Sequence, residues 1–326
     1  QAETIAMRLL RGSGLVGLAG MSSSRIQHGI NIIRPLLQWS RSQLLDVCCH
    51  FGYVFEDDPS NSDRQFERVR IRHLLAQLAL RGEGPSSDQL SRLGVISAKL
   101  LTAATNANAS TLAKVVEWHD AGYATLATEH LADLPKFRFA LLMRRLLMSI
   151  SSSHYAPSGA AFDELRKRIG VGLSATLGGC HFSPVLTQIG RTSNEKGKSL
   201  TYRVFRETGR DLITVAIAAG DEVEFAGSWL VRSQQAGILH ALGDTNKFRN
   251  SFDNVMADKN IPEEWHSVPH RARRAIPVLT TLDGGLIYPQ IGYYGKYRSV
   301  APLSARFLGM AKDPTYHVHA SKGASW

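Results

Sequence analysis

Hydrophobic residues recur at helical spacing in two segments of the first sixty residues. The first segment, residues 3–10, has apolar side chains at i, i+1, i+4 and i+5, namely Ile5, Ala6, Leu9 and Leu10. The second helix is expected to start after Ser40, a favourable N-cap, and to end at Gly52. The apolar run 53–55 then predicts a short buried strand, which would deliver residues 56–61 to its carboxyl end. This pattern predicts the end of an α/β domain, where chemistry is commonly located.

Residues 63–170 are predicted to be mainly helical. A long helix is expected from Asp63, with Glu67 free to pair with Arg70. The Gly/Pro/Ser-rich residues 81–88 interrupt this helix and are typical of an inter-domain joint. About four helices are expected between residues 88 and 169, with Asp88 capping the first and Ser110 the second.

A further helix is predicted to begin near Pro135. Its buried face is expected to contain Leu134, Phe137, Leu141 and Met148. The opposite face is basic and carries Lys136, Arg138, Arg144 and Arg145. Such an edge is most often a solvated helix face, and it is also a candidate for contact with a phosphate backbone.

After Gly170 the pattern changes to short alternating segments separated by glycine, which indicates a small β-rich domain. Strands are predicted within residues 174–177, 202–205, 212–217, 223–225, 229–231, 276–279 and 286–289. Residues 225–229 have the character of a hairpin, since aromatic residues enter and leave a glycine turn. Residues 301–326 have little periodicity and are expected to be an irregular tail.

Composition is that of a folded protein with a basic surface. The 326 residues are 44% hydrophobic, and 38 Lys and Arg against 28 Asp and Glu give a net charge of +10. A positive balance favours a polyanionic partner, because each phosphate contact releases counterions. The three cysteines, two of them adjacent, cannot form a disulfide framework and lack C-x-x-C spacing. No apolar run approaches twenty residues, so no membrane span is expected.

Several motifs occur together in a fixed order. They are Gln-Ala-Glu-Thr at 1–4, Leu-Leu-Arg-Gly-Ser-Gly at 9–14 continuing as Leu-x-Gly-Leu-x-Gly-Met to 21, Ile-Arg-Pro-Leu-Leu at 33–37, Asp-Pro-Ser-Asn at 58–61 and Phe-Glu-Arg-Val-Arg-Ile-Arg at 66–72. In this order they resemble the tRNA(Ile)-lysidine synthetase family of PP-loop ATPases. The close resemblance covers about residues 1–75 and a looser one continues to about residue 295.

The resemblance implies an enzyme that adenylates the wobble cytidine of the CAU anticodon of tRNA(Ile) with ATP and Mg²⁺, and then displaces AMP with the amine of free L-lysine. It implies a cytoplasmic protein without membrane contact, and it allows a homodimer. The expected fold is α/β, the remnant of a doubly wound PP-loop adenylating domain at residues 1–62. A linker helix and joint at 63–87, a helical tRNA-binding domain at 88–170, a β-rich tRNA-binding domain at 171–300 and the tail complete the chain.

One part of the family pattern is absent from this sequence. The family's Ser-Gly-Gly-x-Asp-Ser phosphate loop does not occur in the 326 residues, and the first residue is Gln rather than Met. The sequence is therefore expected to be truncated at its amino terminus and to be inactive alone.

Candidate catalytic residues are those whose chemistry suits adenylation. Arg11 would neutralise phosphate charge, and Glu3 would meet a metal ion or the ammonium group of lysine. Asp58 and Asn61 flank a turn and are candidates for the same site. The residues assigned to ATP are Gln1, Thr4, Gly12, Ser13 and Gly14. For each motif a plain structural role is the alternative: an acid in a first helical turn, a glycine C-cap, or an Asx turn.

Nine arginines are candidates for tRNA binding. Arg68 and Arg72 are four residues apart and share one side of a helix, whereas Arg70 points away. Arg34 is held extended by the proline that follows it. The remaining candidates are Arg138, Arg144, Arg145, Arg271, Arg273 and Arg274.

Two other functions remain open at this stage. The chain could be a tRNA-binding module without catalysis, because it lacks the phosphate loop. It could also belong to a PP-loop enzyme that thiolates or otherwise modifies a tRNA base. The second alternative is disfavoured, because Cys48 and Cys49 lie on a presumed apolar helix and Cys180 lies in a strand region.

Overall fold

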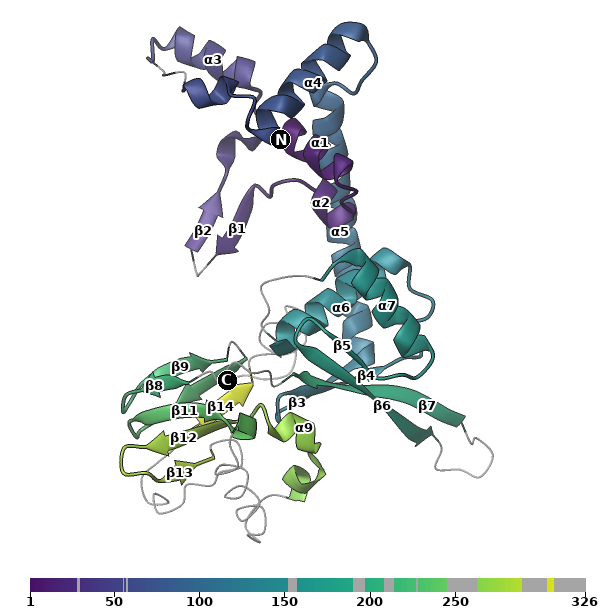
Figure 1. The fold of residues 1–326 in the computed structure, drawn as a ribbon, viewed down its shortest axis with the longest axis vertical. Coiled ribbons are helices and arrows are strands. Elements are labelled where there is room, and N and C mark those ends of the chain that lie inside the picture. The colour runs from purple at the N-terminus through teal and green to yellow at the C-terminus, as the bar shows by residue number, and fades with distance from the viewer. Residues whose placement is uncertain are drawn as a thin grey trace. The chain divides into compact units, whose positions relative to one another are not determined.

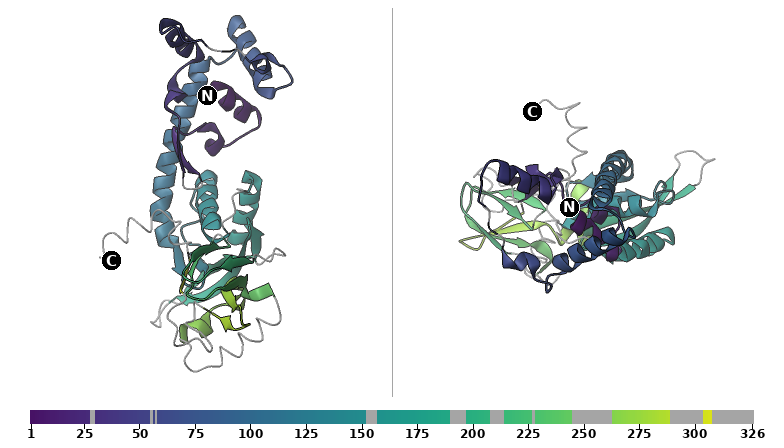
Figure 2. Two further views of the ribbon diagram at one scale, coloured as in Figure 1. Left: turned by 90° about the vertical axis from the view of Figure 1, so that its left-hand side faces the viewer. Right: turned by 90° about the horizontal axis from the view of Figure 1, so that it is seen from above.

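The protein is described by a computed structural model that covers residues 1–27, 30–54, 56, 58–151, 157–189, 197–207, 214–226, 228–244, 263–288 and 304–307. The chain forms two compact units, Gln1–Asn106 and Ala107–Trp326. Helix α5 (Ser87–Val115) is one continuous helix of 29 residues that begins in the first unit and ends in the second (Figure 2).

The first unit is mainly helical and has a small core. Its elements are α1 (Ala2–Leu10), α2 (Leu15–Leu18), the antiparallel strands β1 (Ser24–Gln27) and β2 (Ile30–Ile33), η1 (Pro35–Gln38), α3 (Arg41–His50), η2 (Pro59–Ser62), α4 (Glu67–Arg81) and the start of α5. Buried residues from α1, α4 and α5 form one cluster: Ile5, Ala6, Ile71 and Leu90. Helix α5 passes close to α1 at Gly94, where an added Cβ would lie 2.5 Å from the Cδ1 of Ile5.

Local signals define several ends of these elements. Ser40 caps α3 with a reciprocal capping box, because its hydroxyl accepts from the amide of Gln43 and the side chain of Gln43 accepts from the amide of Ser40. Helix α4 ends at Arg81, and Gly82 adopts a left-handed conformation with φ of 68°. The predicted helix at residues 3–10, the N-cap at Ser40 and the break at 81–88 are confirmed.

Two elements of the first unit differ from their predictions. Residues 53 and 54 are not a buried strand, because Val54 is 96% exposed and belongs to no strand; Phe55 lies outside the described residues. The run is too short to identify the element, and no described strand runs alongside it. Helix α4 begins at Glu67 rather than Asp63, because residues 63–66 form turns that include Asp63 as a side-chain acceptor for the amide of Gln65.

The second unit is built on a five-stranded antiparallel sheet with the order β3-β4-β7-β6-β5. Its strands are β3 (Val116–His119), β4 (Tyr123–Ala127), β5 (Ala175–Leu177), β6 (Cys180–Ile189) and β7 (Gly197–Arg206). Helices α6 (Lys136–Ser151) and α7 (Gly159–Gly170) pack on this sheet and on each other (Figure 1).

Two smaller antiparallel sheets complete the second unit, with the orders β13-β12-β11-β8 and β14-β10-β9. Their strands are β8 (Val215–Ile217), β9 (Glu222–Phe225), β10 (Trp229–Arg232), β11 (Gly237–Ala241), β12 (Pro277–Thr281), β13 (Leu286–Ile287) and β14 (Ser304–Phe307). Short helical turns lie between them, namely η3 (Leu242–Asp244), η4 (Glu263–Ser267) and α9 (His270–Arg273).

A large core holds these sheets and helices together. Fully buried side chains from α6 and the five-stranded sheet, such as Leu146 and Phe182, belong to the same cluster as Phe225, Trp229 and Leu239 from the smaller sheets. A second cluster around Trp265 packs η4 and α9 against β7 and β12. The hairpin predicted at residues 225–229 is confirmed, since β9 pairs with β10 across that turn.

The four or so helices expected between residues 88 and 169 are not found among the residues that the structure describes there. One helix, α5, runs through Ser110, and the β3-β4 hairpin, α6 and α7 follow it. Ser110 is therefore not a cap. At the start of α5 the capping side chain is Ser86 rather than Asp88, because the hydroxyl of Ser86 accepts from the amide of Gln89. Without a glycine or proline at residues 95–113, helical propensity carries the chain through the expected boundary.

The buried face of α6 is also different from the prediction. The residues that pack inward are Phe139, Leu142, Met143, Leu146, Leu147 and Ile150, which continue at i, i+3, i+4 and i+7 along the whole helix. Phe137 and Met148 are exposed, Leu141 is half-buried, and Leu134 alone of the predicted set is buried. In the predicted tail, residues 304–307 form β14, which pairs with β10.

The fold is mixed α/β, as predicted. The described strand pairs are all antiparallel, so the doubly wound parallel sheet expected for residues 1–62 is not found among the described residues. No helix within the described ranges is long and apolar enough to cross a membrane.

A glycine between β3 and β4 provides a test of the core. Gly122 has φ of 81°, and an added Cβ would lie 2.5 Å from the buried ring of Trp229. We expect Gly122→Ala to lower the free energy of unfolding by about 2–4 kcal/mol, because it adds backbone strain and overpacking. Gly159→Ala is the matched control, since nothing lies within 4 Å of its added Cβ. Chemical denaturation measures both, and equal effects would contradict the expected clash.

Candidate functional site

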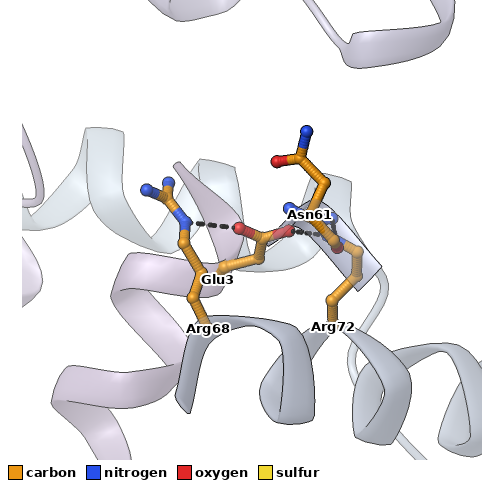
Figure 3. Close-up of polar contacts among 4 residues, drawn as sticks. All are labelled: Glu3, Asn61, Arg68 and Arg72. Carbon is orange, nitrogen blue, oxygen red and sulfur yellow. Dashed lines mark hydrogen bonds and ion pairs between the residues drawn. The ribbon is translucent and has the colours of Figure 1, made fainter. Parts of the chain in front are cut away.

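Glu3 joins helices α1 and α4 through two arginines. Its carboxylate accepts from the Nε of Arg68 at 2.6 Å through one oxygen and from the Nε of Arg72 at 2.6 Å through the other (Figure 3). The two arginines are one helical turn apart on α4, which confirms that they share a side of the helix. Their side chains are 53% and 40% exposed. The Nη groups of Arg68 therefore remain accessible to solvent.

The charges in this cluster stabilise one another. Burial acts to raise the pKa of Glu3, but the hydrogen bonds from Arg72 and Arg68 outweigh it and lower the pKa below its ordinary value. The hydrogen bond with Glu3 likewise raises the pKa of Arg72. With both carboxylate oxygens engaged, Glu3 holds two cations in place in this arrangement, and its predicted contact with a metal ion or with lysine stays a prediction.

The turn at residues 58–61 lies next to this cluster. Arg72 donates from Nη1 to the backbone carbonyl of Asn61 at 3.3 Å, and the side chain of Asn61 points away from Glu3 (Figure 3). Asp58 accepts from the amide of Ser60 at 2.8 Å, and this hydrogen bond lowers the pKa of Asp58. Asp58 thus acts as an Asx cap of η2, which was its structural alternative. The catalytic roles of both residues stay predictions.

Arg11 forms an ion pair with Glu67 and so makes a second link between α1 and α4. The predicted pairing of Glu67 with Arg70 is therefore wrong. Arg70 donates to the backbone carbonyls of Arg64 and Gln65, because the turns before α4 bring those carbonyls beside it.

The glycine-rich loop after α1 closes the helix end. Gly12 has φ of 64°, and its amide donates to the carbonyl of Leu9 at 2.9 Å. The amide of Ser13 donates to the carbonyl of Arg8 at 2.8 Å. Both amides thus satisfy carbonyls at the end of α1, which was the structural alternative for this loop, and the predicted contacts of Gly12, Ser13 and Gly14 with ATP stay predictions. The hydroxyl of Ser13 and the amide of Gly14 remain the candidates in this loop.

Arg8, which was not among the predicted site residues, shapes the same loop. Its Nη1 donates to the carbonyls of Gly17 at 2.7 Å and Gly20 at 3.1 Å. Gly17 packs so closely that an added Cβ would lie 2.5 Å from the Cβ of Ser13. The available signal was a cation in the last turn of a helix followed by glycines.

Gln1 and Thr4, predicted to bind ATP, belong to the same part of the first unit. The side-chain amide of Gln1 and the backbone of Met21 exchange two hydrogen bonds, each of 3.4 Å, so Gln1 secures the end of the loop. Thr4 is half-buried on α1. In the described residues, no three His, Cys, Asp or Glu side chains gather as a metal site.

The other predicted tRNA-binding arginines are divided between the two units. In the first unit, Arg34 donates to the carbonyl of Ser22 at 3.0 Å at the base of the β1-β2 hairpin. In the second unit, Arg138 donates to the side chain of Asn108 at 3.0 Å and thereby ties α6 to α5. Arg144 and Arg145 are half-buried. The basic face predicted for α6 is thus partly an internal contact.

The basic residues at α9 likewise include both internally bonded and exposed arginines. Arg273 donates to the carbonyls of Val268 and His266, and Arg271 contacts His181 at 2.7 Å. Arg271 and Arg274 are exposed, and Arg274 packs beside Gly243.

We expect Glu3→Gln to lower the free energy of unfolding at pH 7 by about 1 kcal/mol, because the cluster is partly screened by solvent. The pKa of Glu3 is lowered from 4.5 by folding, so its contribution is present above that pH and is lost as the pH falls through the folded value. Denaturation curves of the two proteins should therefore converge in acid. A difference that persists at pH 2 would contradict this origin.

Comparisons with known proteins agree with these motifs. The profile of a family described as a PP-loop domain matches residues 1–79. The tRNA(Ile)-lysidine synthase of Anaplasma marginale is 25% identical over 300 residues, which is 89% of this chain and 62% of that protein. That of Wolbachia pipientis wMel is 29% identical over 305 residues, which is 91% of this chain and 64% of that protein.

A shorter and stronger match concerns one part of the chain. The tRNA(Ile)-lysidine synthase of a Bradyrhizobium species is 47% identical over 85 residues, 26% of this chain. The chain spans less than two thirds of the length of each of these three relatives. With the PP-loop match at its start and lysidine synthases aligned along about nine tenths of its length, the chain belongs to the tRNA(Ile)-lysidine synthetase family.

Proposed function

We propose that this protein is a tRNA(Ile)-lysidine synthetase, a ligase that forms a carbon–nitrogen bond. It activates the wobble cytidine of the CAU anticodon of tRNA(Ile) with ATP, and the amine of free L-lysine then displaces AMP. The observation that carries the proposal is the alignment with enzymes of this name along 89% and 91% of the chain. A cytoplasmic location follows from the tRNA substrate.

In this proposal the cluster at Glu3 is a phosphate-facing surface. Glu3 orients Arg68 and Arg72, whose Nε groups it engages, so that the remaining guanidinium groups meet phosphates of the tRNA. Arg11, 63% exposed despite its pair with Glu67, neutralises negative charge as pyrophosphate leaves. Asp58 and Asn61 shape the adjacent turn.

ATP supplies the adenylyl group, and Mg²⁺ is commonly held by substrate phosphates with one or two carboxylates. Of the residues predicted for ATP, the hydroxyl of Ser13 and the amide of Gly14 fit a phosphate contact. Gln1 and Arg8 support the loop that presents them. Thr4 and Gly12 are proposed to act indirectly on ATP binding, because Thr4 lies within α1 and Gly12 lies at the end of that helix.

The tRNA is proposed to bind the basic surfaces of both units. Arg68, Arg72, Arg271 and Arg274 offer solvent-accessible guanidinium groups. Arg34, Arg138 and Arg273 are held by internal hydrogen bonds and would act by shaping their surroundings. Arg144 and Arg145 are half-buried on α6. The proposal is compatible with a homodimer.

The function is tested with the gene product as the cell makes it. Unmodified tRNA(Ile) with a CAU anticodon, ATP and labelled lysine are supplied, and lysine in the tRNA and AMP are measured. We expect one AMP for each lysine incorporated, and no incorporation into a control tRNA with uridine at the wobble position. Binding of tRNA without AMP formation would favour a binding module, and sulfur transfer would favour a thiolating enzyme.

The hydrogen bonds that hold the glycine-rich loop in place provide a further test. Arg8→Met keeps the alkyl chain and removes the two hydrogen bonds to Gly17 and Gly20. We expect kcat to fall roughly 10- to 100-fold, because misplacement of about 1 Å can cost that much, while the KM for lysine changes little. The control is Arg81→Met at the end of α4. Equal kcat for both variants would contradict the role of Arg8.

A further inference from the structure

Helix α5 is anchored in the first unit near its start and in the second unit near its end. Near its start, Gly94 packs against Ile5, and Ser97 is 3% exposed. Near its end, the buried side chain of Asn108 donates from Nδ2 to the carbonyl of Arg138 at 2.8 Å and accepts from the Nε of Arg138 at 3.0 Å. These contacts fix the two ends of the helix to different compact units, whose boundary lies within α5.

The stretch between these anchors, residues 98–107, has little tertiary support. Its residues 99, 100, 102, 103 and 105–107 are exposed, and Leu100 is 55% exposed. Leu101 is half-buried, and Ala104 is the one buried side chain of this stretch, all of which the structure describes. Most of the stability of a helix in a protein comes from the packing of an apolar face. This stretch is therefore held less firmly than the anchored parts on either side.

Two threonine side chains compete for the backbone hydrogen bonds of this stretch. The hydroxyl of Thr102 donates to the carbonyl of Ala98 at 3.0 Å, and that of Thr105 donates to the carbonyl of Leu101 at 2.8 Å. In a helix the same carbonyls accept from the amides of Thr102 and Thr105, so each carbonyl is shared between two donors. Such sharing destabilises a helix slightly and often bends it.

The two shared carbonyls lie on one side of α5. Ala98 and Leu101 are three residues apart, and residues at this spacing are neighbours on one helix face. The weakening is therefore concentrated on that side, where a side chain that enters the hydrogen-bond ladder can kink a helix. Asn106, a poor helix former, lies in the next turn. Because residues 95–113 contain no glycine or proline, the helix is expected to bend here rather than to end.

We propose that residues 98–107 form a hinge, at which the hydroxyls of Thr102 and Thr105 allow α5 to bend while its two ends stay attached to their units. Hinges are short stretches that absorb a change of backbone angles between more rigid parts. The use of this hinge rests on the proposed function, in which one tRNA contacts basic surfaces of both units. Bending of α5 lets both surfaces meet the same tRNA, and the bound tRNA then restricts the hinge.

Hydrogen exchange of the full chain, followed by NMR, tests the hinge directly. The amides of residues 102–107 are the ones that donate to the carbonyls of residues 98–103. We expect these amides to exchange on the order of 10-fold faster than the amides of residues 92–97 and 110–115, because local opening is easier where few contacts are buried. Equal protection along the whole helix would overturn the proposal.

Two double variants test the role of the hydroxyls. Thr102→Val with Thr105→Val removes both hydroxyls and keeps the shape of the side chains, and we expect exchange at residues 102–107 to slow about 2- to 5-fold. Thr102→Ser with Thr105→Ser is the matched control, because it keeps both hydroxyls and because serine and valine have similar helix propensities. This control should exchange as the unaltered chain does. Equal exchange in the two double variants would contradict the proposal.

The use of the hinge in tRNA binding is tested separately. Saturating unmodified tRNA(Ile) should slow exchange at residues 102–107 at least about 5-fold, since a ligand that holds both units rigidifies what lies between them. Exchange that is equally fast with and without bound tRNA would overturn this use of the hinge. Because the exchange of the free chain needs no tRNA, ATP or lysine, a failure of the hinge is distinct from a failure to form lysidine.

Discussion

The carboxylate of Glu3, held between Arg68 and Arg72, is the interaction on which the first unit depends most. Among the described residues, the buried cluster of that unit consists of Ile5, Ala6, Ile71 and Leu90, so apolar burial alone gives α1 and α4 little to hold them together. Glu3 adds two short hydrogen bonds with charge, and Arg11 with Glu67 adds another link. The same contacts orient the arginines that face phosphates in the proposed reaction. Removing the carboxylate would leave two cations side by side without compensation.

The second unit is stabilised differently. Its core joins α6, α7 and the five-stranded sheet to the smaller sheets in one apolar cluster, so its shape does not rely on a few ion pairs. Cys180 lies fully inside that core, and burial raises the pKa of its thiol to about 12. Such a thiol stays protonated at neutral pH, which removes it as a sulfur carrier.

The positive charge of the chain serves two purposes. Several arginines donate to backbone carbonyls or to amide side chains and fix loops or helix pairs, as Arg8 and Arg138 do. Others, such as Arg68 and Arg274, keep guanidinium groups in solvent. A net charge of +10 thus overstates the surface available to an RNA backbone, and only the contacts of each side chain separate the two groups.

The sequence by itself determined the features that depend on neighbouring residues or on a sufficiently long motif. The helix at residues 2–10, the capping box at Ser40, the turn between β9 and β10 and the family were all readable, because periodicity, caps and linked motifs are local. Only the tertiary structure decided which face α6 buries, that residues 53–54 lie exposed, and that Glu67 pairs with Arg11. These outcomes depend on partners more than fifty residues away or on the presence of a neighbouring strand, and a pattern along the chain carries no information about either.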